Sequence, residues 1–176
     1  YKRQVYGPVV RRPHGTYAIR FAGHDDVRLV EQWYQMGKAQ SFDEWKAAVG
    51  LQAMPMFNIG YADAMGNIYY LYNAMLPKRH KAYDWQKYLP GDTSETLWTE
   101  YMPLSGLPQV ENPSSGFVQN CNNTPFRTTS GPDNPNESDL SLIGGIETHM
   151  TNRGLRALEL FGADEQITKD EFYQYK

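Results

Sequence analysis

The chain has 176 residues, a formal net charge of −3 and a pI near 5.8. Its length allows one domain with a substantial core. The basic residues are scattered and the net charge is negative, which excludes a nucleic-acid-binding surface. No apolar run is long enough to span a membrane. A single cysteine, Cys121, excludes an internal disulfide and any metal site built from several thiolates.

The first part of the chain predicts two short strands followed by a helix. Residues 5–10 and 16–21 are β-prone, and Gly15 between them predicts a turn. From Asp25 the apolar residues recur at helical spacing, and Gly37 ends this predicted helix. The apolar positions on which the helix is predicted are Val27, Val30, Trp33, Tyr34 and Met36.

A second helix and a β-hairpin are predicted next. Ser41 and Glu44 have the spacing of a capping box, which opens a short helix that runs to Val49. Residues 56–63 and 68–72 are rich in β-branched and aromatic side chains and flank a Gly-Asn turn, which predicts a hairpin. Nearly every position of both strands is apolar. We therefore expect both faces of this sheet to be covered by other layers.

The second half of the chain predicts loops and then helices. Residues 77–113 carry five prolines and little periodicity, which indicates a long loop such as a functional rim or a wrapping segment. Residues 127–138 are a polar loop. A helix is expected to begin near Ser138 or Asp139 and to break at Gly144–Gly145, and another runs to Gly162. Residues 168–171 form a second capping box, which opens a last helix.

One stretch between these segments stands out, the sequence Gly-Phe-Val-Gln-Asn-Cys-Asn-Asn-Thr-Pro-Phe at residues 116–126. A β-prone run ends abruptly in three asparagines and a cysteine, and Pro125 then prevents its continuation. A strand that delivers side-chain amides to one point can supply a hydrogen-bond donor to a developing oxyanion. An ordinary turn is the alternative, because asparagine tolerates turn geometry.

Three further residues have both a structural and a functional interpretation. Cys121 is either a small buried hydrophobic residue or a nucleophile that needs a histidine close in space. Arg153, at the start of a helical stretch, is either a solvated charge or a guanidinium turned inward to hold polar groups near the asparagines. Asp139 is either a helix N-cap or a carboxylate ligand for a hard cation. The four histidines have no metal-ligand spacing.

Several short motifs occur in the same order and with similar gaps in the penicillin amidase family. They are Tyr6-Gly7-Pro8-Val9-Val10, Glu31-Gln32-Trp33, Asn58-Ile59-Gly60-Tyr61-Ala62-Asp63 with Gly66-Asn67-Ile68, Pro77-Lys78-Arg79, and Asn112-Pro113-Ser114-Ser115-Gly116-Phe117 running into Asn122-Asn123-Thr124-Pro125. Over nearly all its residues the chain resembles the middle of that family's β-subunit. The resemblance implies an α+β fold that is a segment of a four-layer αββα sandwich, with residues 1–176 forming part of the β-subunit of an N-terminal nucleophile hydrolase.

The resemblance also implies an activity. In this family a precursor cleaves itself, and the new N-terminal serine of the β-chain attacks the amide bond of an N-acylated small molecule such as a β-lactam, an acyl-homoserine lactone or a lipopeptide. That serine would lie upstream of the matched region, since Tyr1 cannot be the nucleophile. We therefore expect the chain alone to be inactive. Its expected partners are the remaining α- and β-segments of the same precursor, and the expected location is periplasmic or secreted.

Residue by residue, the resemblance assigns three positions. Asn122 would donate its side-chain amide to the tetrahedral oxyanion, and Arg153 would organise the surroundings of the nucleophile. Asp139 would be a ligand of the structural calcium that some members bind, and no other cofactor is expected. A noncatalytic, aromatic-rich binding or assembly module is the rival hypothesis. An enzyme requires Asn122 to face an open cleft with Arg153 nearby, whereas a Cys121 hydrolase requires a histidine within hydrogen-bond reach of the thiol.

Overall fold

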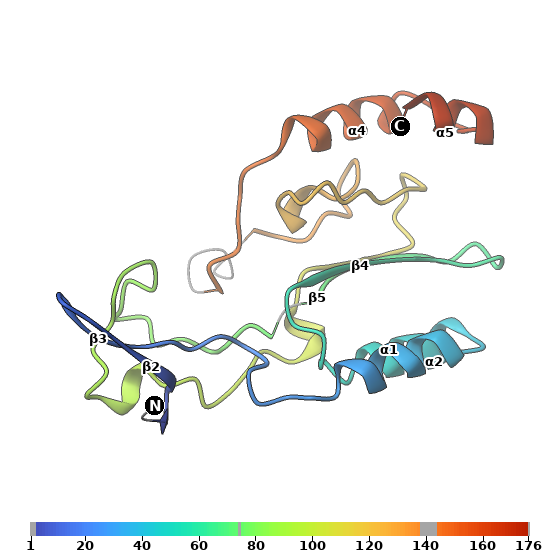
Figure 1. Cartoon of the computed structure of the whole chain (residues 1–176). Coiled ribbons are helices and arrows are strands. Elements are labelled where there is room, and N and C mark those ends of the chain that lie inside the picture. Colours follow the sequence, from blue (N-terminus) through green and yellow to red (C-terminus); the bar gives the residue numbers. More distant parts are fainter. Residues whose placement is uncertain (1–2, 74, 138–143, 176) are drawn as a thin grey trace.

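The computed structural model describes residues 3–73, 75–137 and 144–175 (Figure 1). Helices and strands are mixed, as the α+β prediction requires. The elements are β1 (Arg3–Gln4), β2 (Gly7–Arg12), β3 (Gly15–Ala18), α1 (Leu29–Lys38), α2 (Phe42–Val49), β4 (Phe57–Ala62), β5 (Ile68–Asn73), β6 (Gln109–Glu111), α4 (Asn152–Gly162) and α5 (Lys169–Tyr175). Short 3₁₀ turns lie at Ser94–Thr96, Leu104–Gly106 and Pro125–Arg127.

The elements form layers around a central sheet of β4, β5 and β6 (Figure 1). Helices α1 and α2 lie along one side of the sheet. An irregular segment, residues 113–137, lies on the other side and separates the sheet from α4 and α5. Two contacts confirm this order, because Asn58 on β4 bonds Asn120 in the irregular segment, and Phe117 in that segment packs edge-on against Phe161 of α4. The small hairpin of β2 and β3 projects from the end of the molecule that is farthest from α5 and from the β4–β5 turn.

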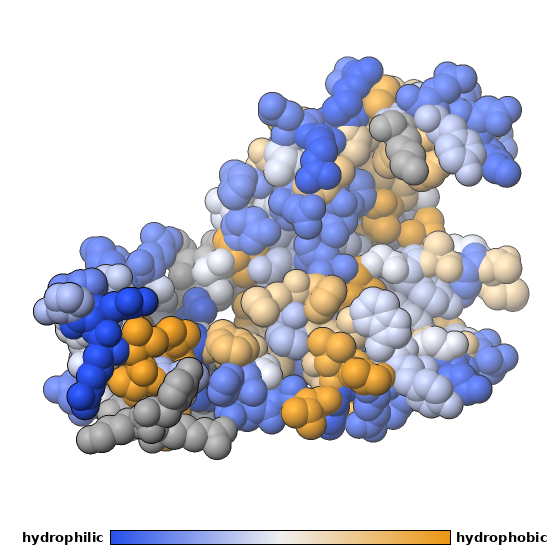
Figure 2. All heavy atoms as spheres, viewed as in Figure 1, coloured by the Kyte–Doolittle hydropathy of each residue, from blue (hydrophilic) through white to orange (hydrophobic). Residues whose placement is uncertain are grey.

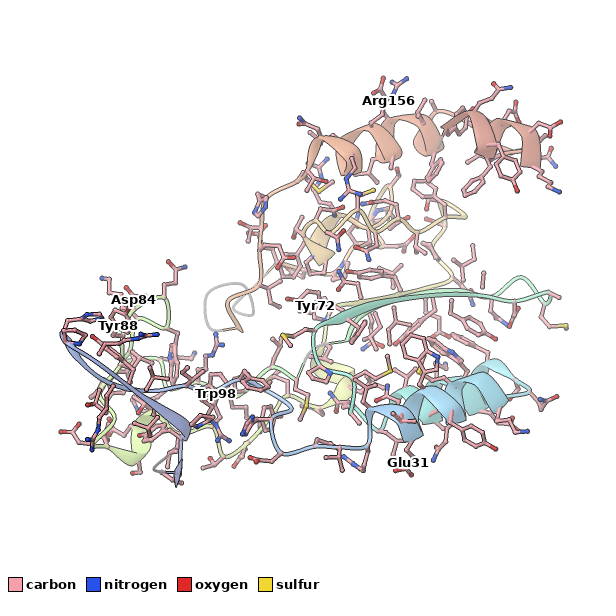
Figure 3. The ribbon with its side chains drawn as sticks, viewed as in Figure 1. Glu31, Tyr72, Asp84, Tyr88, Trp98 and Arg156 are labelled. Carbon is pink, nitrogen blue, oxygen red and sulfur yellow. The ribbon has the colours of Figure 1, made fainter. Side chains whose placement is uncertain are left out.

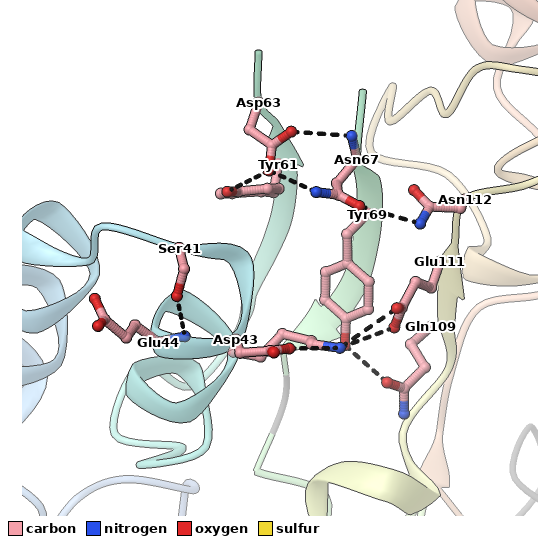
Figure 4. A network of polar contacts seen from close by, with 11 residues as sticks. Ser41, Asp43, Glu44, Tyr61, Asp63, Asn67, Tyr69, Gln109, Glu111 and Asn112 are labelled. Atoms are coloured by element: carbon pink, nitrogen blue, oxygen red, sulfur yellow. Dashed lines mark hydrogen bonds and ion pairs between the residues drawn. The ribbon is translucent and has the colours of Figure 1, made fainter. Parts of the chain in front are cut away.

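The predicted hairpin is confirmed as β4 and β5, which pair antiparallel with Ile59 opposite Leu71. A carboxylate closes the turn, since Asp63 accepts hydrogen bonds from both the main chain and the side chain of Asn67 (Figure 4). Asp63 also accepts from the main-chain N–H of Met65. The hydrogen bond from the Asn67 side chain is the main cause that lowers the pKa of Asp63.

The third strand was not predicted. β6 lies within residues 77–113, which were expected to form a loop, and it pairs antiparallel with β5. The Tyr69 hydroxyl donates to the side-chain oxygen of Gln109 on β6 at 2.7 Å (Figure 4). Asn112 accepts a bond from the main-chain N–H of Ile68 at 2.8 Å. Three residues are too few to carry a periodic signal, so only the neighbouring strand defines this one.

Coverage of the sheet differs between its strands. Tyr69, Tyr70 and Leu71 are consecutive on β5 and all fully buried, so both faces of the central strand are covered as expected. The expectation fails on β4, where Phe57 is 44% exposed and Gly60 and Ala62 are exposed. The reason is that β4 forms an edge of the sheet within the described residues, with β5 as its pairing partner.

Aromatic rings join α2 to the sheet. The Trp45 ring lies 4.5 Å from that of Tyr61 and 5.9 Å from that of Tyr69, measured between centroids. The Phe42 ring stacks on Tyr61 at 5.0 Å. The predicted capping box at the start of α2 is present in part: the main-chain N–H of Glu44 donates to the Ser41 hydroxyl, while the Glu44 carboxylate accepts from Gln40 instead of Ser41.

The helix predicted from Asp25 begins later, at Leu29. Of the apolar residues on which it was predicted, Met36 packs against the core and the others are largely exposed. Val30, Trp33 and Tyr34 are 59–73% exposed, whereas Gln32 is completely buried. The Gln32 amide donates to the carbonyl of Val49 at 3.4 Å and accepts from the main-chain N–H of Ala53 at 2.6 Å. The Val49 carbonyl, at the end of α2, also accepts from the main-chain N–H of Gln52. The buried N–H of Ala53 needs a partner in the core, so a polar residue is turned inward.

We expect Gln32→Ala to lower the free energy of unfolding by about 1–3 kcal/mol, because it leaves the N–H of Ala53 buried without its partner. Chemical denaturation of the protein measures the effect. Gln35→Ala is the matched control, since Gln35 lies on the same helix, is exposed and bonds Glu31 on the surface. Equal losses for the two variants would contradict the assignment.

Candidate active site

The asparagine-rich stretch is a turn that is held by its own side chains. Residues 116–121 form no strand in the structure, so the strand prediction was wrong. Their polar groups are bonded locally instead: the main-chain N–H of Gln119 donates to the carbonyl of Thr128 at 2.7 Å, and its side chain donates to the carbonyl of Arg127 at 2.8 Å. Asn122 has φ = 53°, a left-handed conformation that asparagine adopts more readily than most residues.

A neighbouring asparagine anchors this turn. Asn123 is only 1% exposed, and its side-chain oxygen accepts from the main-chain N–H of Cys121 at 3.1 Å. Its side-chain nitrogen donates to the carbonyl of Thr124 at 2.8 Å, and the N–H of Thr124 in turn donates to the carbonyl of His149. With Asn123 committed to the backbone, the amides that remain exposed at the turn are those of Asn120 and Asn122. The Asn120 oxygen accepts from Asn58 on β4 and from the main-chain N–H of Asn122, so Asn120 is tied to the sheet.

Arg153 lies directly over this turn. It is the second residue of α4, whose N-cap is Thr151, the acceptor of a bond from the N–H of Gly154. The Arg153 guanidinium donates to the carbonyl of Cys121 at 3.2 Å and to the side-chain oxygen of Asn122 at 3.4 Å. A guanidinium has donors only, so it engages the oxygen of the Asn122 amide and leaves the two N–H donors directed away from it.

The close approach of α4 depends on a glycine. A Cβ atom at Gly154 would lie 2.7 Å from the side-chain oxygen of Asn123 and 3.0 Å from the methyl group of Met150. Thr151 adds a bond from its hydroxyl to the carbonyl of Cys121 at 3.3 Å. Sequence reasoning missed Asn123, Thr151 and Gly154. A threonine before the helix was the one signal that could have indicated a cap.

Asn122 lines a cleft of about 500 Å³ between the sheet and residues 20–22, which follow the N-terminal hairpin. Met56 and Phe57 form an apolar wall of this cleft, and Glu147 and Tyr72 add polar groups. Figure 3 shows Tyr72 and Trp98, two residues that line it, in the middle of the molecule. Thus the structure brings Asn122 and Arg153 together and leaves the Asn122 amide exposed at a cleft, the arrangement that an enzyme requires.

Two side chains of the cleft have shifted acidities. Burial, with the Glu147 carboxylate nearby, raises the pKa of Tyr72 to about 12. Burial lowers the pKa of Arg79, although an arginine remains charged at any physiological pH. The cleft therefore combines positive charge from Arg20 and Arg79 with one carboxylate and an apolar wall.

The remaining candidate residues from the sequence are Asp139 and Cys121. Asp139 and the start of the helix predicted there lie outside the described residues. Within the described ranges, no three His, Cys, Asp or Glu side chains are grouped so as to hold a metal ion. Cys121 is half-buried, and its hydrogen bonds in the described structure use main-chain atoms, with none between its thiol and a histidine.

Comparison with known proteins now defines the family. The family model described as penicillin amidase matches residues 1–176. The chain belongs to the penicillin amidase family. It is 36% identical to the penicillin G acylase of Escherichia coli over 127 residues, which is 70% of this chain and 15% of that protein. It is 26% identical to the acyl-homoserine lactone acylase PvdQ of Pseudomonas putida over 200 residues, which is 97% of this chain and 25% of that protein.

The fold also matches. The thermostable penicillin G acylase of Alcaligenes faecalis superimposes with a TM-score of 0.75 at 24% identity, over 98% of this chain and 30% of that structure. The family member described here therefore has the fold of these acylases but spans at most about a third of the length of these relatives. Among its described helices, none has the length and apolar character needed to cross a membrane.

We expect Gly154→Ala to destabilise the protein by about 1–3 kcal/mol, because the added methyl group meets Asn123 at 2.7 Å. Gly37→Ala is the matched control. A Cβ at this exposed helical glycine contacts nothing within 4 Å, so the substitution should stabilise α1 by up to about 1 kcal/mol. Thermal unfolding of both variants tests the pair, and a stabilised Gly154→Ala protein would contradict the close packing.

Proposed function

We propose that the chain is part of an amidohydrolase that cleaves the amide bond of an N-acylated small molecule. The observation that carries this proposal is the exposed Asn122 amide, held by Arg153 at the edge of a cleft. An amide donor fixed before the reaction begins is suited to an oxyanion, since it needs no reorganisation when the charge develops. Membership of a family whose relatives are named as acylases supports the same conclusion.

In the proposed reaction, an N-terminal serine from another part of the full-length protein adds to the substrate carbonyl. The α-amino group of that serine takes the hydroxyl proton and returns it to the leaving amine. An acyl-enzyme ester remains, which water hydrolyses. The contribution of this chain is the side-chain N–H of Asn122, which donates to the tetrahedral oxyanion. Arg153 acts as a positioning residue because it holds the oxygen of the same amide.

The cleft also supports a substrate class. Met56 is 76% exposed and Phe57 is 44% exposed, and both line the same cleft as Asn122. Such side chains suit the apolar part of an acyl group. Penicillins, acyl-homoserine lactones and lipopeptides all carry one. The relatives are named for the first two of these classes, and the choice among the three classes is left to substrate screening.

The proposal includes partners. The side chains of Val27, Val30, Trp33 and Tyr34 are exposed around α1, and on the face in Figure 2 apolar atoms gather in the same region. A monomeric protein rarely exposes a contiguous patch of this kind. We propose that the remaining α- and β-segments of the acylase precursor cover these apolar side chains, because the relatives are several times longer than this chain. A periplasmic or secreted location is proposed on the family resemblance alone.

Asn122→Ala in the full-length protein should lower kcat by about 10²–10³-fold with little change in KM, as expected for the loss of one oxyanion donor. Steady-state hydrolysis of N-acyl substrates from the three classes measures this. Asn152→Ala is the matched control, because Asn152 is exposed at the start of α4 and should leave kcat unchanged. A variant at Asn122 with full activity would contradict the assigned role.

The 176-residue chain by itself should show no turnover, since its proposed nucleophile lies elsewhere. Activity of the isolated chain that is abolished by Asn122→Ala would contradict this. A folded full-length protein without any amidase activity would instead favour the noncatalytic binding or assembly module.

A further inference from the structure

A second cavity lies beside the N-terminal hairpin, apart from Asn122. Its volume is about 370 Å³, and it is enclosed by β3 and by the loop that runs from Arg79 to Trp98. Figure 3 places Tyr88 at the hairpin and Trp98 where the hairpin meets the rest of the molecule. Five aromatic side chains line the cavity: Tyr6, Tyr17, Trp85, Tyr88 and Trp98. Aromatic walls on this scale are typical of sites for small ring-containing ligands.

The charged side chains that line this cavity are all cationic: Arg20, Arg79 and Lys87. Lys87 is neutralised in part by Asp84, whose carboxylate lies 3.0 Å from its ammonium group. Arg20 forms no ion pair with a carboxylate in the described structure. Its guanidinium donates only to two main-chain carbonyls, those of Val5 at 3.4 Å and Trp98 at 3.3 Å. The positive charge of Arg20 is thus half-buried without an opposite charge.

Flat groups are stacked along one wall of the cavity. The Arg79 guanidinium carbon lies 5.5 Å from the centre of the Trp85 ring and 5.4 Å from that of Trp98. The Arg20 guanidinium lies 5.8 Å from the Trp98 ring on which Arg79 also packs. These contacts hold both guanidinium groups in fixed orientations and leave aromatic surface beside them. A planar ligand with a carboxylate at one end would match both features.

We propose that this cavity binds an aromatic carboxylate, with its ring among Trp85, Tyr88 and Trp98 and its carboxylate on Arg20. The site does not depend on the proposed hydrolase activity, since Asn122 and Phe57 line the cleft and not this cavity. Arg20, Arg79 and Trp98 line both spaces and form the wall between them. A ligand bound here would therefore lie next to the cleft without occupying it.

Isothermal titration of the full-length protein with benzoate tests the proposal, and benzamide serves as the uncharged probe of the same shape. We expect benzoate to bind at least tenfold more tightly than benzamide. Trp85→Leu and Arg20→Gln should each weaken benzoate binding at least tenfold. Phe57→Leu, which alters only the cleft, should leave binding at this site unchanged.

Three results would overturn the proposal. One is the absence of benzoate binding. Another is equal affinity for benzamide, which would show that no anion is recognised. The third is loss of binding in Phe57→Leu with retention in Trp85→Leu, which would place the ligand in the cleft. Unfolding midpoints check that each variant is folded, and Arg20→Lys replaces Arg20→Gln if the latter is not, with a smaller loss of affinity expected.

Discussion

The side-chain amide of Asn123 is the contact on which the candidate site depends. It is buried, and its oxygen and nitrogen are both used to hold the main chain on either side of it, at Cys121 and Thr124. This fixes the turn in which Asn122 adopts its left-handed conformation. The same side chain forms the surface on which Gly154 packs, and so it determines how near α4 can approach. This contact therefore supports the position of Arg153 relative to Asn122, alongside the direct bonds of Arg153 to Cys121 and Asn122.

Two neighbouring asparagines therefore have separate tasks. Asn123 satisfies buried main-chain groups, which would otherwise cost about 1–3 kcal/mol each. Asn122 contributes little to that framework and keeps its donors exposed. This division suits a residue that interacts with something outside the chain, because its hydrogen-bonding capacity is not used up in the fold. The cap at Thr151 adds support, since it joins α4 to the carbonyl of Cys121 that Arg153 also contacts.

The central sheet separates the candidate site from helices α1 and α2 (Figure 1). β5 is buried on both faces, with α2 packed on one side and the irregular segment on the other. The exposed apolar side chains of α1 and β4 lie outward from this core. Their exposure agrees with the proposed role of the chain as one part of a longer acylase, in which further segments would cover them. The stacked arginines and tryptophans beside the hairpin form a second region, which shares a wall with the cleft.

Local sequence determined several elements, because their signals lie within a few residues. The hairpin of β4 and β5, the start of α2 at Ser41, and the cap at Thr168 with Glu171 were predicted from spacing alone, and the structure contains each of them. The resemblance of ordered motifs to the penicillin amidase family indicated both Asn122 and Arg153 as candidate site residues, and the structure places the two in contact. The resemblance did so without any geometry, since the two residues are 31 positions apart in the chain.

Only the tertiary structure decided the rest. β6 exists because β5 offers it hydrogen bonds, and residues 116–121 lack a strand because their polar groups bond to the loop that follows. Gln32 is turned inward because it accepts from the buried main-chain N–H of Ala53 beyond the end of α2, which no pattern within α1 could reveal. The closeness of Gly154 to Asn123 likewise depends on two distant segments. Periodicity records which residues are apolar, whereas contacts between distant segments decide which polar groups need a partner.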